Sequence, residues 1–502
     1  MKLKKVGLEF VSLDDHILFV DILNYKSINQ SQQTILNLTQ YDIVKKEIRE
    51  KTEIEDILDF DFDDFNKYCM FFHNFYESGD SKNFKSIVLL MIRFFSSNKE
   101  KFDNHDFNMI YFIEIFQKNN TIEIFSNILQ NNNSDLLGIV LDFVSLLSSL
   151  NPEICEFIAS HNGLLDEIYP KFINFEDKHI FENSLILFNN LIRYYNGQLF
   201  LNDKIISTIY EKIGDFAIND HISMNLAITF VLYFDVPPLN IPNIKKIILN
   251  SLHNRQFFDS LTLIFIISKK FPDLIHFFIQ EIFPVLFHQA QFIQESQSFI
   301  LFFKLFSLII SLNHNLFKDQ ILNVFNWGIM EKSFKFNSDK VVNEVFVFLI
   351  NCYPCSYERL QSCFPSLNDF VLFLIETMNN GKLYMKETCI RFISLFIKEY
   401  PISLQYFLDD GFIDTCINLM ECDVIGNNLI IMNFLKNLAE IPMTKYPIIK
   451  DFFNALIQTD LINILENLSL SEEEEVSSLA EYIIDYFHRF YYYDNNDNLV
   501  FD

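Results

Sequence analysis

The chain has 502 residues, of which half are hydrophobic and only 10 are Gly and 12 are Pro. All-β and α/β folds need more turn residues than this, so the composition predicts an all-α fold with short polar loops, either as three domains or as one long repetitive array. The net charge of −27 comes without a basic stripe, which argues against nucleic acid as a direct ligand.

Residues 1–66 are expected to form an irregular N-terminal region. The basic start MKLKK is followed by only three apolar residues before Glu9, so it does not have the apolar core of a signal peptide. Residues 50–64 form an acidic segment with eight acids and one Lys, a net charge of −7. Within residues 53–65 the acids alternate with Ile, Leu and Phe, and two interpretations stay open: a disordered partner-binding motif or an acidic helix that begins the folded array.

Eight apolar runs further along the chain end in the same way, at a proline or an asparagine. Proline disfavours a helical residue before it and suits the first turn of the next helix, so each stop is predicted to be a junction between helices. The intervals between stops are 44, 41, 35, 41, 41, 47 and 41 residues, a period typical of helical repeats. The stops are Pro152, Asn196, Pro237, Pro272, Asn313, Pro354, Pro401 and Pro442.

Two of these units also place a glycine at a similar distance after the stop, Gly163 after Pro152 and Gly411 after Pro401. Together with the segments FLKNLAE (434–440) and FNNLIRYYN (188–196), this pattern resembles the armadillo repeat. The resemblance implies a right-handed α-α superhelix of nine or ten units over residues 67–490, followed by a tail at 491–502. A HEAT-like or mixed α-solenoid is the alternative.

The most lipid-like run, residues 298–312, has 15 residues with Lys304 inside and is shorter than the roughly 20 that span a bilayer. We therefore expect no membrane span. The eight scattered Cys fit a reducing compartment, so the expected location is intracellular and cytoplasmic, with the nucleus as the alternative.

The sequence contains one C-x-x-C motif, Cys352 to Cys355, with Cys363 close behind. A zinc site would want four ligands, and a redox pair usually opens a helix after a strand, so the preferred interpretation is packing thiols at a helix junction. An oxidation-sensitive pair and a metal site are the alternatives. Phosphate-binding and nucleophile motifs are missing and no His pair has zinc spacing, so we expect no catalytic, cofactor or metal residues and no enzyme.

The armadillo resemblance implies that the last helix of each repeat lines a concave, partner-binding surface. The twelve residues before each stop sum to a charge of +2 over the eight units, which predicts a neutral or acidic protein partner. The chain's own segment 53–65 is predicted to occupy part of this groove when no partner is bound. The runner-up function is a structural or regulatory subunit of a larger complex, and a helical enzyme is a more distant alternative. The candidate contact residues are Asn189, Arg193, Arg391, Lys398, Lys436 and Asn437.

Overall fold

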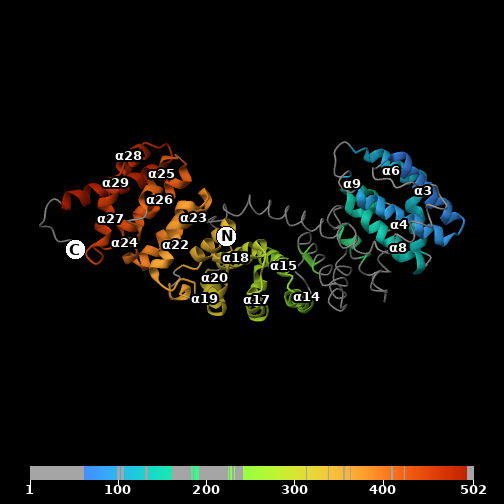
Figure 1. Ribbon diagram of the computed structural model, residues 1–502, viewed down its shortest axis with the longest axis horizontal. Helices are drawn as coiled ribbons and strands as arrows, with labels where there is room; N and C mark the ends of the chain where they lie inside the picture. Colours follow the sequence, from blue (N-terminus) through green and yellow to red (C-terminus); the bar gives the residue numbers. More distant parts are fainter. Residues whose placement is uncertain are drawn as a thin grey trace, which may run out of the picture. The chain divides into compact units, whose positions relative to one another are not determined.

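The computed structural model describes residues 61–98, 107–130, 134–160 and 241–494, apart from short gaps inside these ranges, and isolated positions at 102 and between 183 and 231. Every regular element in this described part is a helix, as the composition predicts. The chain divides into two compact units, Met1–Ile247 and Ile248–Asp502, and the colours of Figure 1 follow it from one to the other. Within the described residues, no helix is long and apolar enough to cross a membrane.

Unit 1 begins with an antiparallel helix pair, α3 and α4, joined by the short turn at residues 78–80. The start of α3 lies beside the end of α4, because the rings of Phe65 and Phe95 are 5.6 Å apart, and the far ends meet where Phe72 and Phe84 are 4.7 Å apart. The described helices of this unit are α3 (Phe62–Glu77), α4 (Ser81–Ser97), α6 (Met109–Lys118), α7 (Thr121–Gln130), α8 (Ser134–Leu150) and α9 (Pro152–Ser160).

Unit 2 consists of successive groups of helices, each ending in one helix that stacks on its counterparts in the neighbouring groups. We call these stacked helices the long helices and the others the short ones, after their usual length, although the stacked helix at 339–351 has 13 residues and the unstacked one at 367–380 has 14. The helix α14 (Ile241–His253) contains the boundary with unit 1. The long helices are α15 (Phe257–Lys270), α18 (Ser296–Leu312), α21 (Asp339–Asn351), α23 (Leu383–Glu399), α26 (Ile425–Ala439) and α29 (Glu474–Asp494). The short ones are η3 (Pro272–Leu274), α16 (Ile275–Glu281), α17 (Phe283–Ala290), α19 (His314–Val324), α20 (Gly328–Phe334), η4 (Tyr357–Leu360), α22 (Leu367–Asn380), η5 (Pro401–Ser403), α24 (Leu404–Phe407), α25 (Phe412–Glu421), α27 (Ile448–Ile457) and α28 (Leu461–Ser469).

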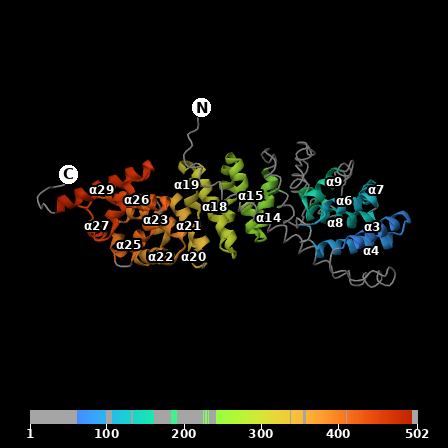
Figure 2. The ribbon, with the colours of Figure 1, turned by 90° about the horizontal axis from the view of Figure 1, so that it is seen from above.

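The long helices of unit 2 stack in chain order. Each one from α15 to α26 packs against the next, and α29 packs against α26 at the end of the row. Figure 2 shows this row running from green at α15 to red at α29. In unit 1, α4 and α8 pack on each other in the same way. A row in which each repeat contacts its neighbours is the architecture of a solenoid.

Several predicted junctions are confirmed. The helix α8 ends at Leu150 and Pro152 opens α9, while Pro272 opens η3 directly after α15, and Pro401 opens η5 directly after α23. The helix α26 ends at Ala439, just before Pro442. Gly411 begins α25 with a φ of 73°, a left-handed conformation that glycine adopts without a steric cost. The stops Asn196, Pro237, Asn313 and Pro354, and also Gly163, lie outside the described residues.

Phenylalanine forms much of the core between these helices. The fully buried ring of Phe306 on α18 lies 5.0 Å from Phe283 and 4.9 Å from both Phe287 and Phe302. A further contact, at 6.2 Å, reaches Phe325 after α19. One side chain of a long helix therefore joins the helices of two successive groups.

The last residues of the acidic segment, from Asp61 onward, form the start of the helix α3. Asp61 is the N-cap of α3, and its carboxylate accepts a hydrogen bond from the Asp63 backbone N–H at 3.3 Å. The ring of Phe62 lies 5.0 Å from that of Tyr111, and Phe65 is fully buried. Residues 61–65 therefore form the start of a helix inside the predicted irregular region, while residues 1–60 lie outside the described part. At the other end α29 continues to Asp494, past the predicted limit at 490.

Candidate functional site

The long helices α18, α21, α23 and α26 each leave one narrow stripe uncovered, and α29, at the end of the row, is exposed more widely. On α23, Tyr384, Arg391 and Lys398 are exposed at steps of seven residues, which is two helical turns, whereas Phe392 and Phe396 between them are buried. Because α18 to α29 pack side by side, these stripes adjoin one another. We call this surface the long-helix face. Its exposed and half-buried members include Lys304, Glu344, Tyr384, Arg391, Lys398, Asn433, Lys436, Asn437, Glu440 and Tyr482.

Polar contacts connect the stripes of α23, α26 and α29. The Asn437 side-chain N–H donates a hydrogen bond to the Ser394 hydroxyl at 2.6 Å. Lys398 forms an ion pair with Glu440 at 3.1 Å, and the Lys436 ammonium lies 5.7 Å from the centre of the Tyr482 ring. The residues joined by these contacts are 42 to 46 positions apart in sequence, close to the repeat period.

The ion pair of Lys398 and Glu440 is open to solvent, with side chains 33% and 47% exposed. Exposed pairs of this kind contribute about 0–1 kcal/mol to stability. The pair therefore orients the two side chains on the surface, and a ligand can displace it at small cost. The Asn437 bond uses one N–H of an amide that has two donors and an acceptor oxygen, so the described contacts do not use its full hydrogen-bonding capacity.

A second set of charges connects α18, α21 and α23. Lys304 lies 4.0 Å from Glu344, and Lys382 lies 4.0 Å from Asp339. The pKa of Tyr384 is raised, chiefly by partial burial and further by the negative charges of Asp339 and Glu344. The phenol therefore keeps its proton at neutral pH and can act as a hydrogen-bond donor on this face.

The structure brings four of the six predicted contact residues together. Arg391 and Lys398 lie on α23, and Lys436 and Asn437 lie on the adjoining α26.

The expectation for Asn189 is corrected, because its side chain is only 7% exposed and its amide oxygen is buried without a hydrogen-bond partner. A polar residue type suggested a surface position, but the packing of the surrounding helices covers it. Arg193 lies outside the described residues.

Sequence reasoning missed a set of exposed apolar residues at the N-terminal ends of the long helices. Leu383 begins α23 and is 47% exposed, and Val424 and Ile425 begin α26 at 43% and 50%, whereas Leu470, at 83%, caps the C-terminal end of α28. The stacking places these ends along one edge of the long-helix face. The sequence did contain a signal for them. Each is an apolar residue that directly follows a polar turn and does not fall on the helical spacing of the buried residues.

Only one cysteine of the C-x-x-C motif lies in the described part of the chain. Cys352 is fully buried and caps the end of α21, Cys363 is half-buried, and Cys355 lies outside the described residues. Within the described part there is no cluster of His, Cys, Asp or Glu that could hold a metal ion.

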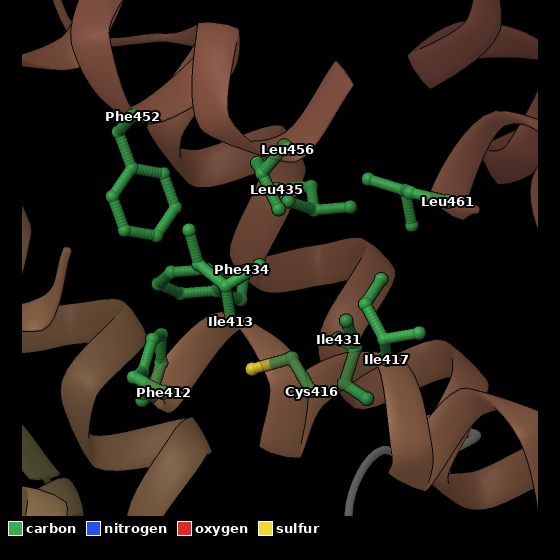
Figure 3. A pocket seen from close by; sticks show the side chains of 10 residues that line it. All are labelled: Phe412, Ile413, Cys416, Ile417, Ile431, Phe434, Leu435, Phe452, Leu456 and Leu461. Carbon is green, nitrogen blue, oxygen red and sulfur yellow. The ribbon is translucent and has the colours of Figure 1, made fainter. Parts of the chain in front are cut away.

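Figure 3 shows a pocket between α25, α26, α27 and the start of α28, with only apolar side chains and Cys416 around it. Its volume is about 10 Å³, roughly the space for the centre of one water molecule, whereas ligand pockets measure about 300–1,000 Å³. Burial raises the pKa of the Cys416 thiol, so it is not an activated nucleophile. The pocket is a packing gap within the core.

Neither a family model nor a curated protein matches the sequence. Among solved structures, an engineered protein aligns with a TM-score of 0.59 and 12% identity over 84% of this chain and 99% of that chain. A chain from a structure of the phosphorylation-controlled interaction between cadherin and beta-catenin aligns with a TM-score of 0.56 and 11% identity over 81% of this chain and 84% of that chain. A designed armadillo repeat protein covers 64% of this chain at 11% identity with a TM-score of 0.27. The three-helix groups, the glycine before α25 and the stacked long helices give this chain the fold of an armadillo-like solenoid.

Proposed function

We propose that the protein is a non-catalytic scaffold or adaptor that holds an extended segment of a protein partner on its long-helix face. The observation that supports this most is the clustering of Arg391, Lys398, Lys436 and Asn437 on the adjoining helices α23 and α26. These side chains supply hydrogen-bond donors on the middle and C-terminal turns of the two helices, and the exposed apolar residues Leu383, Val424 and Ile425 lie at their N-terminal ends.

The charges of this surface favour a neutral or acidic partner segment. Lys398 is already paired with Glu440, and Lys304 faces Glu344, so Arg391 and Lys436 leave a small excess of positive charge among the members of this face on α18 to α26. A polybasic peptide would meet no excess of acids there. An extended acidic or neutral segment can instead accept hydrogen bonds from Asn437 and Arg391, while Tyr384 and Ile425 cover its apolar side chains.

The proposal also includes a cellular compartment and an alternative function. The thiols Cys69, Cys155, Cys389 and Cys416 are buried and form no disulfide, which supports a place in a reducing, intracellular compartment. The runner-up is a structural or regulatory subunit that uses the ends and the short-helix side of the array.

The test compares two triple variants of the full chain as bait in native cell extract. The first reverses charge on the long-helix face (Arg391→Glu, Lys398→Glu, Lys436→Glu), and the second makes the same charge change on lysines outside that face (Lys335→Glu, Lys445→Glu, Lys450→Glu). We expect the first variant to capture at least about tenfold less partner than the unmodified chain, because the loss of one contact of about 1.4 kcal/mol lowers affinity tenfold. The second variant should capture as much as the unmodified chain. Equal capture by both variants would contradict the proposal, and loss in the second alone would favour the subunit. Preferential binding of a polybasic peptide would refute the charge argument.

A further inference from the structure

In unit 1 the first long helix, α4, carries a basic stripe on the side away from its core. Phe84, Val88, Met91 and Phe95 are buried against the neighbouring helices. The opposite stripe, at steps of three and four, consists of Lys82, Lys85, Leu89, Arg93 and Ser96, all exposed or half-buried. An apolar residue therefore lies between cations along one side of the helix.

Two of these cations have no counter-charge in the fold. Neither Lys85 nor Arg93 forms an ion pair or hydrogen bond through its side chain with any residue that the structure describes. By contrast, lysines such as Lys67 and Lys398 are paired at 2.8 Å and 3.1 Å. In a chain of net charge −27, Lys85 and Arg93 therefore give one side of α4 a local positive charge that can accept an acidic segment.

The chain itself supplies an acidic segment directly before α3 in the sequence. Residues 50–60, EKTEIEDILDF, contain five acids and one Lys, with Ile54, Ile57 and Leu58 among them. This composition matches the stripe, because its acids can pair with Lys85 and Arg93 and its aliphatic residues can cover Leu89.

The connection to α3 brings this segment to the correct end of α4. Since α3 and α4 are antiparallel, the start of α3 lies beside the last turns of α4, where Phe65 contacts Phe95 on the buried side of that helix. Lys82 is eleven residues from Arg93 along α4, about 16 Å at 1.5 Å per residue. Eleven residues span about 36 Å when extended, so an extended segment can pass around α4 and reach the whole stripe, whereas the same residues as a helix of about 16 Å are too short to do both.

We propose that residues 50–60 lie along the basic stripe of α4 and cover the first long helix of unit 1. The contact covers cations of unit 1 that would otherwise be open to an acidic ligand, so the segment would compete with any acidic ligand of α4. It depends only on unit 1 and its preceding segment, so it does not rest on the function proposed for the long-helix face of unit 2.

The experiment is zero-length carbodiimide crosslinking of the full chain, which joins a carboxylate to a nearby lysine, followed by peptide mapping. The pairs Lys67–Asp64 and Lys398–Glu440 serve as internal positive controls. We expect crosslinks from acids of residues 50–60 to Lys85 and Lys82, reduced severalfold in 1 M salt, where the screening length falls to about 3 Å. Crosslinks from this segment mainly to lysines of unit 2, or none beside the controls, would overturn the proposal.

A variant pair makes the test specific. In Lys85→Gln/Arg93→Gln the remaining crosslink to Lys82 should fall about tenfold, while Lys118→Gln, an exposed lysine on α6, should leave it unchanged. A mixture of isotopically heavy and light chains shows whether the crosslink lies within one chain. Crosslinks between heavy and light chains, or an unchanged Lys82 crosslink in the double variant, would refute an intramolecular charge contact.

Discussion

Phe306 provides a quantitative test of the solenoid packing. Its ring is fully buried and lies within 6.2 Å of four other Phe rings from two successive helix groups. Truncation to Ala removes this contact and leaves a cavity that rigid neighbouring rings cannot fill, so Phe306→Ala should destabilise the region by about 3–5 kcal/mol. At about 1.4 kcal/mol per factor of ten, this corresponds to roughly 10²- to 10⁴-fold faster local opening.

Hydrogen exchange of the full chain, followed by mass spectrometry, is the appropriate assay because long repeat arrays often unfold in parts and a single melting temperature does not describe them. Faster exchange should concentrate in α17, α18, α19 and α21, which neighbour the cavity, while α4 and α8 keep their protection, since solenoid repeats contact only their neighbours. Leu470→Ala is the matched control: that side chain is 83% exposed and should change stability by no more than about 0.5 kcal/mol. Uniform loss of protection along the whole chain, or a loss below about 1 kcal/mol, would refute this account.

Three further predictions concern the whole fold and its cysteines. Circular dichroism should show well over half helix, compared with about a third in ordinary globular proteins, and a strand-dominated spectrum would contradict the fold. Replacing Cys352 and Cys355 together by Ala should cost about 1–2 kcal/mol, and elemental analysis should find no zinc in either protein; one zinc per chain, lost in the variant, would reverse the packing interpretation. Burial raises the pKa of Cys155, Tyr68 and Tyr486 to about 12, so these groups lose their protons at lower pH in the unfolded chain than in the folded one. The free energy of unfolding should therefore fall as pH rises from about 9 to 12. Alkaline denaturation curves that are flat over this range would contradict this prediction.

The helix junctions were predictable because they depend on local chemistry. Proline restricts the residue before it wherever it occurs, so Pro152, Pro272 and Pro401 could be placed at helix starts without knowledge of any neighbour. The same holds for Gly411, whose left-handed conformation depends on its own missing side chain.

The site was less predictable because exposure depends on tertiary contacts. Asn189 and Asn437 are the same residue type in similar sequence surroundings, yet the first is buried and the second is half-buried beside Ser394. Likewise, a window of twelve residues gives the charge of a helix but not which cations pair across to the next one. The partner of Lys398 is Glu440, 42 residues away, and only the stacking of α23 on α26 brings them together.

The N-terminal segment gives a final prediction about regulation. A deletion up to residue 66 would remove Phe62 and Phe65, which pack against Tyr111 and Phe95, so the cut belongs after residue 60. Without residues 1–60 the cations of α4 lose their competitor, and binding of an acidic partner segment should strengthen. If the segment covers its surface nine-tenths of the time, the apparent dissociation constant should fall about tenfold, because apparent affinity scales with the fraction of open protein.

The control for this deletion keeps the segment and removes its charge, with Glu53→Gln, Glu55→Gln, Asp56→Asn and Asp59→Asn in the full chain. Since the proposed contact is electrostatic, this variant should gain most of the affinity that the deletion gains. The gain should also shrink in high salt, where the charges are screened. If the deletion strengthens binding and the neutralised chain does not, the segment acts by bulk and not by charge. Unchanged affinity in both would show that the segment does not compete for the partner surface at all.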